Sequence, residues 1–267
     1  MEGLAFSLAG LVVGTAVGAT GVGGGSLMTP ILILFYGISP AVAVGTDLLY
    51  ASISKAFGVA LHGRHGTVDW KIVGWMSAGS VPAALLTLLF LREHTASNSA
   101  DSLIKLTLAV AVILTATFAL LQEPLLRILK RGERPGHRGF VERHQRVLTV
   151  ICGVLIGALV TISSVGAGVI GMMLLLILYP AHAPIRLVGS DLAHAVLITG
   201  IAGLGHAGLG TVDYPMLGYL LVGALPGIWL GTRVAFRLDD KALKRAISGL
   251  LIFIGCTMAA KAVGAGF

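Results

Sequence analysis

The stretch VGTDLLYA at residues 44–51 returns as VGSDLAHA at residues 188–195, and HGRHGTVDW at 62–70 returns as HAGLGTVDY at 206–214. One offset of 144 residues relates both pairs, and thirteen of the forty positions from 44 to 83 are identical to their counterparts. Chance matching of Leu, Val and Ala does not explain this, because rarer residues carry much of the match: Asp47 and Asp191, His62 and His206, Asp69 and Asp213, Pro82 and Pro226. The chain is therefore predicted to be a tandem duplication.

The composition places both copies in a membrane. Of the 267 residues, 56% are hydrophobic and 12% are charged, and the mean hydropathy is +0.92. A soluble domain carries about 25% charged residues, so these values exclude a soluble or a disordered chain. About 20 apolar residues cross a bilayer as a helix, and runs of that length recur at 42–61, 72–91, 103–121, 187–205, 214–236 and 246–263. We predict an all-α polytopic membrane protein with two homologous halves.

A basic stretch joins the two halves. Residues 127–146 hold seven Arg and Lys against two Glu, which accounts for five of the seven net positive charges. This concentration is typical of a loop rather than of a nucleic-acid-binding face. We predict a first transmembrane repeat at 1–122, a basic cytoplasmic linker at 123–146 and a second transmembrane repeat at 147–267, with the lipid bilayer as a partner and no nucleic acid.

Charge also predicts how the halves are oriented. Positive residues collect on the cytoplasmic side of membrane proteins, and a second basic cluster lies at 233–245. If both clusters are cytoplasmic, the equivalent loops at 62–69 and 206–213 face opposite sides, and the halves form inverted repeats. Asp239 and Asp240 dilute the second cluster, which leaves parallel repeats with four crossings per half as an alternative. Helix counts of eight and ten both fit.

The leading segment of each half has an unusual length. Residues 4–36 and 147–180 each form an apolar stretch of about 33 residues, too short for two full spans and too long for one. We predict that each is a span followed by a short helix, with a glycine-interrupted junction between them. In the first half the junction is the glycine run at 21–25, and the matching stretch in the second half is 163–168.

These junctions are predicted to bind an anion. Non-helical backbone is tolerated at membrane depth where protein buries it or where it lines a cavity, and a short helix beginning near Ser26 would point its positive end at converging N–H groups. Close helix packing explains glycines four residues apart, such as Gly10, Gly14 and Gly18, but not adjacent ones. The predicted substrate-binding residues are Gly23, Gly24, Gly25, Ser26, Thr46, Ser163, Ser164, Gly166, Gly168 and Ser190.

Two carboxylates lie well inside predicted spans, Asp47 and Asp191. An ionisable residue at that depth is a functional hypothesis. An ionised carboxylate would repel an anion and a protonated one would not, so we predict that Asp47, Asp191 and the nearby His194 couple proton movement to anion movement. The alternative is a structural role, either capping a broken helix or bonding to Thr46 and Ser190.

Other polar residues give weaker signals. Lys55 lies eight residues after Asp47, near the same helix face, and its counterpart is Thr199, so any role of Lys55 is asymmetric. The HGRH sequence at 62–65 lacks the Glu of a zinc-binding HExxH motif. No metal, cofactor or catalytic residue is predicted.

Several motifs resemble one family of carriers. GVGGGSLMTP at 21–30, AVGTDLLYA at 43–51 and HGRHGTVDW at 62–70, in a chain of two halves, resemble the sulfite exporter TauE/SafE family, also called the 4-toluene sulfonate uptake permeases. The resemblance covers nearly the whole chain outside the linker. It implies a multi-pass carrier of the bacterial inner membrane for sulfur-containing anions, such as sulfite, thiosulfate, sulfoacetate or aryl sulfonates. Gly23, Gly24 and Gly25 match the family's glycine motif, whereas the second copy departs from it at Ala167 and Val169.

Three classes of function are compatible with these features. The preferred class is a secondary transporter of a small anion and not an enzyme, with alternating access from one repeat rocking against the other. An anion channel needs a continuous polar pore, whereas the intramembrane polar residues form two clusters. An intramembrane aspartyl enzyme would use the two Asp residues as a pair, but the chain lacks a GxGD motif.

Overall fold

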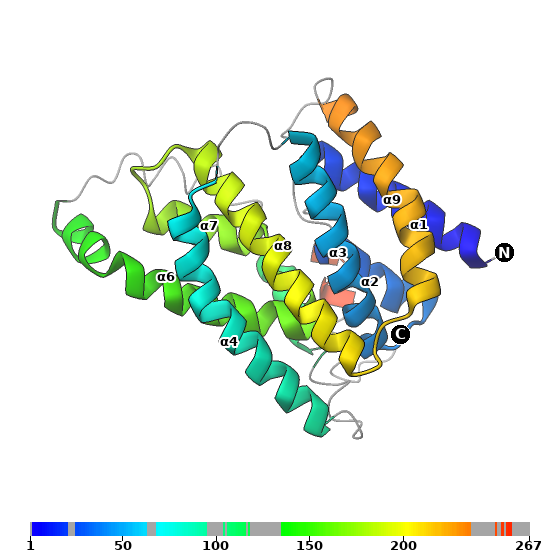
Figure 1. The fold of residues 1–267 in the computed structure, drawn as a ribbon. Coiled ribbons are helices and arrows are strands. Elements are labelled where there is room, and N and C mark those ends of the chain that lie inside the picture. Colours follow the sequence, from blue (N-terminus) through cyan, green and yellow to red (C-terminus); the bar gives the residue numbers. More distant parts are fainter. Residues whose placement is uncertain are drawn as a thin grey trace.

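The computed structural model describes residues 2–20, 25–62, 68–94, 104, 106–115, 117, 135–235, 249, 252–253 and 255–257, and the elements that it describes are helices (Figure 1). Their bounds are α1 (Glu2–Thr20), α2 (Gly25–Tyr36), α3 (Pro40–His62), α4 (Trp70–His94), α6 (Pro135–Ser163), α7 (Val169–Leu178), α8 (Pro184–Gly208) and α9 (Tyr214–Ala235). An apolar helix also covers Leu106–Thr115.

The helices confirm the predicted all-α membrane architecture. The runs predicted at 42–61, 72–91, 187–205 and 214–236 coincide with α3, α4, α8 and α9. Within the described part of the chain, four helices have the length and hydropathy of a membrane span: Trp70–Glu93, Arg143–Ser163, Ile185–Gly208 and Tyr214–Arg233. The predicted runs at 103–121 and 246–263 lie partly outside the described residues.

The leading segment of each half consists of two helices, as predicted. α1 ends at Thr20 and the short helix α2 begins at Gly25, while α6 ends at Ser163 and the short helix α7 begins at Val169. One expectation is corrected: α6 begins at Pro135, so the C-terminal part of the predicted linker is helical rather than a loop. Proline is favoured in the first turn of a helix, and the Glu, Arg and Gln residues that follow are good helix formers.

Helices of one half pack closely against helices of the other. α1 lies along α9, where Gly10 and Gly14 contact the backbone of Leu220 and Ala224 so closely that a Cβ atom would overlap it. α4 lies along α6 in the equivalent way, because Gly153 approaches the backbone of Met76 to the same degree. Small residues at four-residue spacing permit such backbone contact in membranes. The predicted packing role of Gly10, Gly14 and Gly18 is confirmed.

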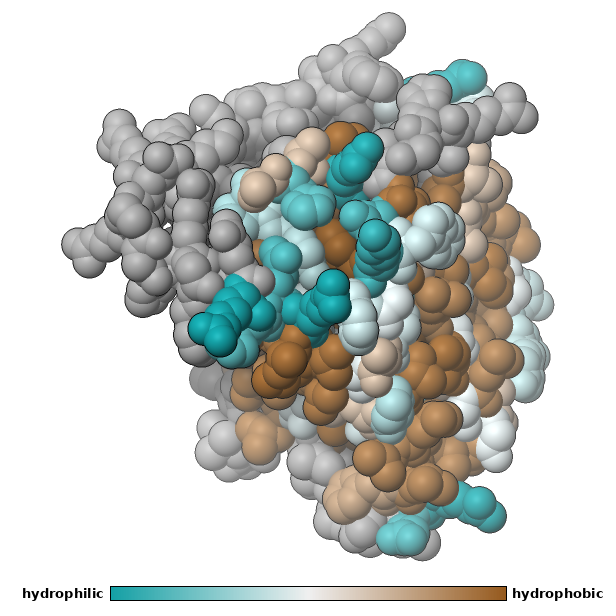
Figure 2. Space-filling model, turned by 60° about the vertical axis from the view of Figure 1, so that its left-hand side comes forward, coloured by the Kyte–Doolittle hydropathy of each residue, from teal (hydrophilic) through white to brown (hydrophobic). Residues whose placement is uncertain are grey.

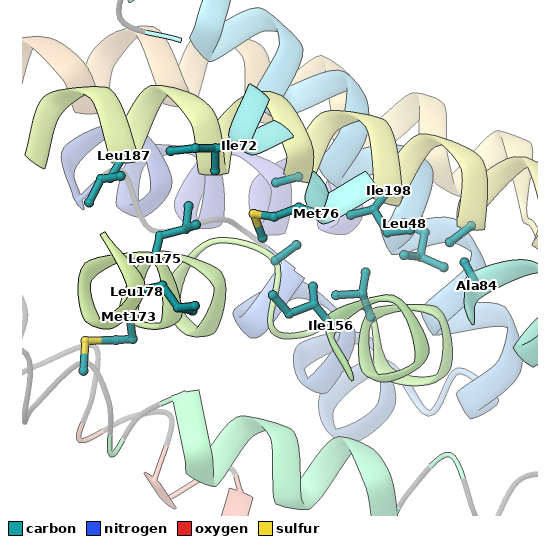
Figure 3. Packing of buried hydrophobic residues seen from close by; sticks show 14 of the residues in the cluster. Leu48, Ile72, Met76, Ala84, Ile156, Met173, Leu175, Leu178, Leu187 and Ile198 are labelled. Atoms are coloured by element: carbon teal, nitrogen blue, oxygen red, sulfur yellow. The ribbon is translucent and has the colours of Figure 1, made fainter. Parts of the chain in front are cut away.

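The hydrophobic cores follow these exchanged pairs. One core joins α1, α2 and part of α3 to α9, with Val13, Met28 and Leu220 among its buried residues. The other joins α4 to α6, α7 and α8, and it includes Met76 and Ile156, which are labelled in Figure 3. Each packed unit therefore contains one helix from the opposite half of the sequence.

The two units meet where α3 crosses α8 at the centre of the molecule (Figure 1). The Oγ of Ser52 donates to the carbonyl of Val196 at 3.1 Å, 144 residues along the chain. Gly45, near the start of α3, lies against Thr211, which follows the end of α8. Gly203, near the end of α8, lies against Leu49. The contacts run in opposite chain order, so α3 and α8 are antiparallel.

Two equivalent hydrogen bonds fasten the ends of this crossing. The backbone N–H of Asp213 donates to Thr46 Oγ1 at 3.0 Å, and the backbone N–H of Asp69 donates to Ser190 Oγ at 2.8 Å. The carboxylates of Asp69 and Asp213 accept N–H groups at the starts of α4 and α9, as N-cap residues do. The duplicated sequence thus forms this hydrogen bond twice: a hydroxyl of the first half contacts the second half, and the equivalent hydroxyl of the second half contacts the first.

The outer surface is apolar where lipid would contact it. Leu86 on α4, Leu204 on α8 and Val222 on α9 each leave about two thirds of their surface exposed. Figure 2 shows that hydrophobic residues cover much of the described surface in this view, with hydrophilic residues gathered in a patch from the middle to the upper part of the view and in another at its lower edge. An apolar surface of this extent is typical of contact with a membrane.

Candidate functional site

Buried polar side chains gather beside the α3 and α8 crossing. Asp47 and Lys55 of α3 and Asp191 of α8 have 0%, 4% and 5% of their surface exposed. Ionisable side chains are almost never buried to this degree without a partner, and inside a membrane they mark a functional site. These three residues therefore define the candidate site, together with the segment at 164–168 between α6 and α7, here called the second junction.

Asp47 is held by the short helix of its own half. The Oγ1 of Thr29 in α2 donates a short hydrogen bond to Asp47 Oδ2. The second carboxylate oxygen, Oδ1, is buried and has no hydrogen-bond partner among the residues that the structure describes. The carboxylate thus links α2 to α3, and it also interacts with Ser164 of the second junction.

Asp191 meets the short helix of the second half differently. Its Oδ1 lies over Gly171 of α7, so close that a Cβ atom at this position would overlap the oxygen. Within the described part of the chain, this oxygen has no hydrogen-bond partner. Glycine at 171 therefore provides the space that the carboxylate occupies, without donating to it.

Lys55 connects the carboxylates to the second junction. Its Nζ donates to the carbonyl oxygen of Ala167 at 2.9 Å, across 112 residues of sequence. The ammonium group interacts electrostatically with both Asp191 and Asp47. Neither carboxylate forms an ion pair with Lys55 within 4 Å in the described structure. Lys55 therefore lies in the field of both carboxylates while it is anchored to the backbone.

The second junction has unusual backbone conformations. Ser164 has φ of 58°, and Gly166 and Gly168 have φ of 115° and 125°. A positive φ is uncommon for a residue with a side chain, and such strain persists where the surrounding structure imposes it. Ser163 ends α6 with its Oγ bonded to the carbonyl of Leu159 at 2.7 Å. The Oγ of Ser164 is buried, and it interacts with the Asp47 carboxylate of the first half.

The other predicted site residues have different surroundings. Thr46 and Ser190 accept hydrogen bonds from backbone N–H groups of the loops before α9 and α4, so both hydroxyls contribute to the packing of α3 and α8 against these loops. His194 Nε2 lies 2.8 Å from Ser80 Oγ of α4, so this ring nitrogen pairs with a serine. Gly23 and Gly24 lie outside the described residues, and Gly25 and Ser26 begin α2, as the expected helix start near Ser26 requires.

The structure adds contacts that the sequence does not predict. Thr29 is not among the predicted site residues, although a hydroxyl in the short helix after the glycine run is a signal for a partner of Asp47. Lys55 was identified only as a neighbour of Asp47, whereas it also reaches the second half. The Ala167 carbonyl has no signature in the sequence, because every residue carries a backbone carbonyl. Only the fold determines which of these carbonyls meets Lys55.

The charges of this arrangement can change with protonation. Lys55 contacts the second junction through Ala167 and lies in the field of two carboxylates, so proton uptake would change the net charge beside it. Among the residues that the structure describes, no three His, Cys, Asp or Glu side chains lie close enough to hold a metal ion.

Comparisons with known proteins agree with a transport role. A family model described as "Sulfite exporter TauE/SafE" matches residues 6–258. The chain is 36% identical over 250 residues to "Probable membrane transporter protein YjnA" of Bacillus subtilis (strain 168), covering 93% of this chain and 96% of the relative. It is 23% identical over 269 residues to "Probable membrane transporter protein MJ0441" of Methanocaldococcus jannaschii, covering 94% and 93%. No solved structure matches the chain.

Proposed function

The chain belongs to the sulfite exporter TauE/SafE family, and on this premise we propose that it is a secondary transporter that moves sulfur-containing anions across the bacterial inner membrane. Sulfite, thiosulfate and organosulfonates are the substrates that this family resemblance favours. Its relatives are named as probable membrane transporters, and its apolar helices make it a multi-pass membrane protein. The proposed substrates are sulfur-containing anions, and the proposed driving force is the proton gradient.

One observation carries the proposed mechanism: Asp47 and Asp191 are buried at equivalent positions of the two halves, with Lys55 in the field of both. While both carboxylates are ionised, they neutralise the ammonium and leave a net negative charge that repels an anion. Proton uptake by the carboxylates removes that charge and leaves Lys55 to attract the substrate. Anion and proton would therefore move together.

The start of α7 is the proposed contact for the anion. Gly168, its N-cap residue, makes no side-chain hydrogen bond to the first turn. The first N–H groups of a helix lack partners within the helix, and together with the helix dipole they attract negative charge. The buried hydroxyl of Ser164 is a further donor in the same junction. In the first half, Gly23, Gly24, Gly25 and Ser26 would serve equivalently before and within α2.

The transport cycle is proposed to use inverted repeats, with the linker at 123–146 on the cytoplasmic side. The antiparallel crossing of α3 and α8 and the exchanged contacts of Thr46 and Ser190 support this topology. The backbone contact between α1 and α9, and between α4 and α6, suggests which bodies move. We expect the two packed units, each with one exchanged helix, to rock about the crossing of α3 and α8.

Flux measurements test this proposal. Purified protein in proteoliposomes should take up one of labelled sulfite, thiosulfate or a simple sulfonate with saturable kinetics, and an inward proton gradient should increase the rate. Empty liposomes and uptake without a gradient are the controls. An anion current that follows voltage without saturation would indicate a channel. Absence of flux for every compound would contradict sulfur anions as the substrate class.

A further inference from the structure

The buried ammonium of Lys55 donates a hydrogen bond to a backbone carbonyl of the second junction. Its Nζ lies 2.9 Å from the Ala167 oxygen, and 4% of the lysine's surface is exposed. Taking an ammonium out of water is costly, and lysines in apolar segments commonly extend their charge to the membrane surface instead. The contact also joins the two halves, because Lys55 belongs to α3 and Ala167 lies between α6 and α7. Its cost indicates a specific role.

The contact fixes the orientation of one peptide group. The Ala167 carbonyl and the Gly168 N–H belong to the same planar trans peptide group, so they point in opposite directions. Rotation of this group changes φ of Gly168, which is 125° here, and glycine accepts such values more readily than other residues. Turns of types I and II differ by a rotation of this kind. Lys55 therefore selects the orientation in which the Gly168 N–H points away from the ammonium.

The Gly168 N–H is the first of several donors at the start of α7. The N–H groups of residues 168–170 donate to no acceptor among the residues that the structure describes. The next N–H group, of Gly171, donates to the Gly166 carbonyl at 3.3 Å. Backbone N–H groups inside proteins are nearly always paired, so the unpaired ones are available to a bound anion. Lys55 sets the direction of the first of them.

The equivalent position of the second half makes no such connection. Thr199 of α8 is the counterpart of Lys55, and its Oγ1 donates to the carbonyl of Ala195 in its own helix at 2.7 Å. One copy of this position therefore contacts the opposite half, whereas the other directs its hydroxyl to its own helix. The lysine is an addition to the duplicated scaffold, and it acts on the second junction.

We propose that Lys55 is a positioning residue for anion binding: its hydrogen bond holds the Ala167–Gly168 peptide group in the orientation that presents the Gly168 N–H to the anion. This inference rests on the proposed anion contact at the start of α7. The role is separate from the charge of Lys55, since a neutral donor that reaches the same carbonyl would also hold it. Its structural part, the orientation of one peptide group, does not depend on which anion is carried.

NMR of the purified protein tests the structural part without an anion. With ¹³C at alanine carbonyls and ¹⁵N at glycines, each Ala–Gly pair gives one cross-peak, and Ala167–Gly168 is one of six such pairs. The peak missing from an Ala167→Ser sample identifies it. Lys55→Met, which cannot donate, should move this peak, whereas Lys55→Gln, of the same side-chain length, should keep it near its wild-type position. Lys71→Met, at an exposed lysine of α4, is the matched control.

Uptake of ³⁵S-labelled sulfite into proteoliposomes tests the functional part. The KM of Lys55→Met should rise about tenfold, as expected for the loss of one hydrogen bond to a charged group, with a smaller change in the maximal rate. Lys55→Gln should recover part of this loss, because the donor returns and the charge does not. Across the variants, the KM should follow the position of the Ala167–Gly168 peak.

The two measurements separate the possible failures. An unmoved Ala167–Gly168 peak in Lys55→Met would overturn the proposal, whatever the flux. So would a Lys55→Gln protein with the wild-type peak and the KM of Lys55→Met, since the lysine would then act through its charge. If Lys55→Met does not fold, Lys55→Leu replaces it, and failure of both beside a folded Lys55→Gln would reduce the contact to a structural one. A moved peak without sulfite uptake by the wild type would contradict sulfite as the substrate and support the peptide orientation.

Discussion

Asp47 and Asp191 occupy equivalent positions of the duplicated sequence, yet each one makes a different contact with the short helix of its half. Thr29 of α2 donates a hydrogen bond to Asp47, whereas Gly171 of α7 only makes room for Asp191. Lys55 lies on the helix of Asp47, and its counterpart beside Asp191 is Thr199. The duplication therefore fixes where the carboxylates lie, and later differences in single residues decide what they contact. Equivalent substitutions should have unequal effects.

The strongest test of this comparison removes each carboxylate in turn. Asp47→Asn should abolish the dependence of anion flux on an imposed pH gradient, because an amide cannot bind and release a proton. Asp191→Asn should do the same if both halves carry protons. The measurement is initial flux into proteoliposomes with and without the gradient.

Asp213→Asn is the matched control, since Asp213 caps α9 and Asn is an equally good cap residue. Its flux should retain the pH response. If only one of the two buried Asp variants loses coupling, proton transfer belongs to that half alone. Full coupling in both variants would make the carboxylates structural.

Gly171→Ala should have the next largest effect, and only on the second half. The added methyl group would overlap Asp191 Oδ1, and overpacking of this kind costs about 1–3 kcal/mol. We expect a lower melting temperature and a loss of flux, since Asp191 must move away from α7. Gly218→Ala on α9, where a Cβ meets nothing within 4 Å, is the control. Unchanged flux in Gly171→Ala would mean that the close approach has no role.

Much of the fold could be predicted because the duplication repeats local signals. The motif at 44–51 and its copy at 188–195 mark α3 and α8, and the 33-residue length of the leading segments predicted a span followed by a short helix. The pairing of α1 with α9 was not predicted. A glycine stripe shows that a helix has a close partner, but the stripe carries no information about which helix that partner is.

The site was predicted less completely for a related reason. Asp47 and Asp191 stand out because carboxylates are rare in apolar runs. The contact of Lys55 with Ala167 spans 112 residues and ends on a backbone carbonyl, so no side-chain pattern records it. Thr46 and Ser190 were predicted to bind substrate from their place beside the carboxylates, and their backbone contacts with the neighbouring loops depend on the tertiary crossing of α3 and α8.

Thr29→Val tests the feature that distinguishes the first half, and we expect the smallest effect from it. Valine has nearly the same shape but cannot donate, so Asp47 Oδ2 would lose its hydrogen bond in a buried site. Leaving one buried acceptor unsatisfied costs about 1–3 kcal/mol, which lowers the melting temperature while α2 and α3 stay packed. In the control Thr87→Val, the lost hydroxyl bonds only to the carbonyl of Ala83 in its own helix.

A double-mutant cycle with Asp47→Asn separates the hydrogen bond from the loss of the hydroxyl itself. If Thr29 acts through Asp47, the two substitutions together should destabilise the protein by less than the sum of their separate effects. Strict additivity would show that the carboxylate does not depend on α2. The surroundings of Asp47 would then differ from those of Asp191 through Lys55, and not through the contact of each carboxylate with its short helix.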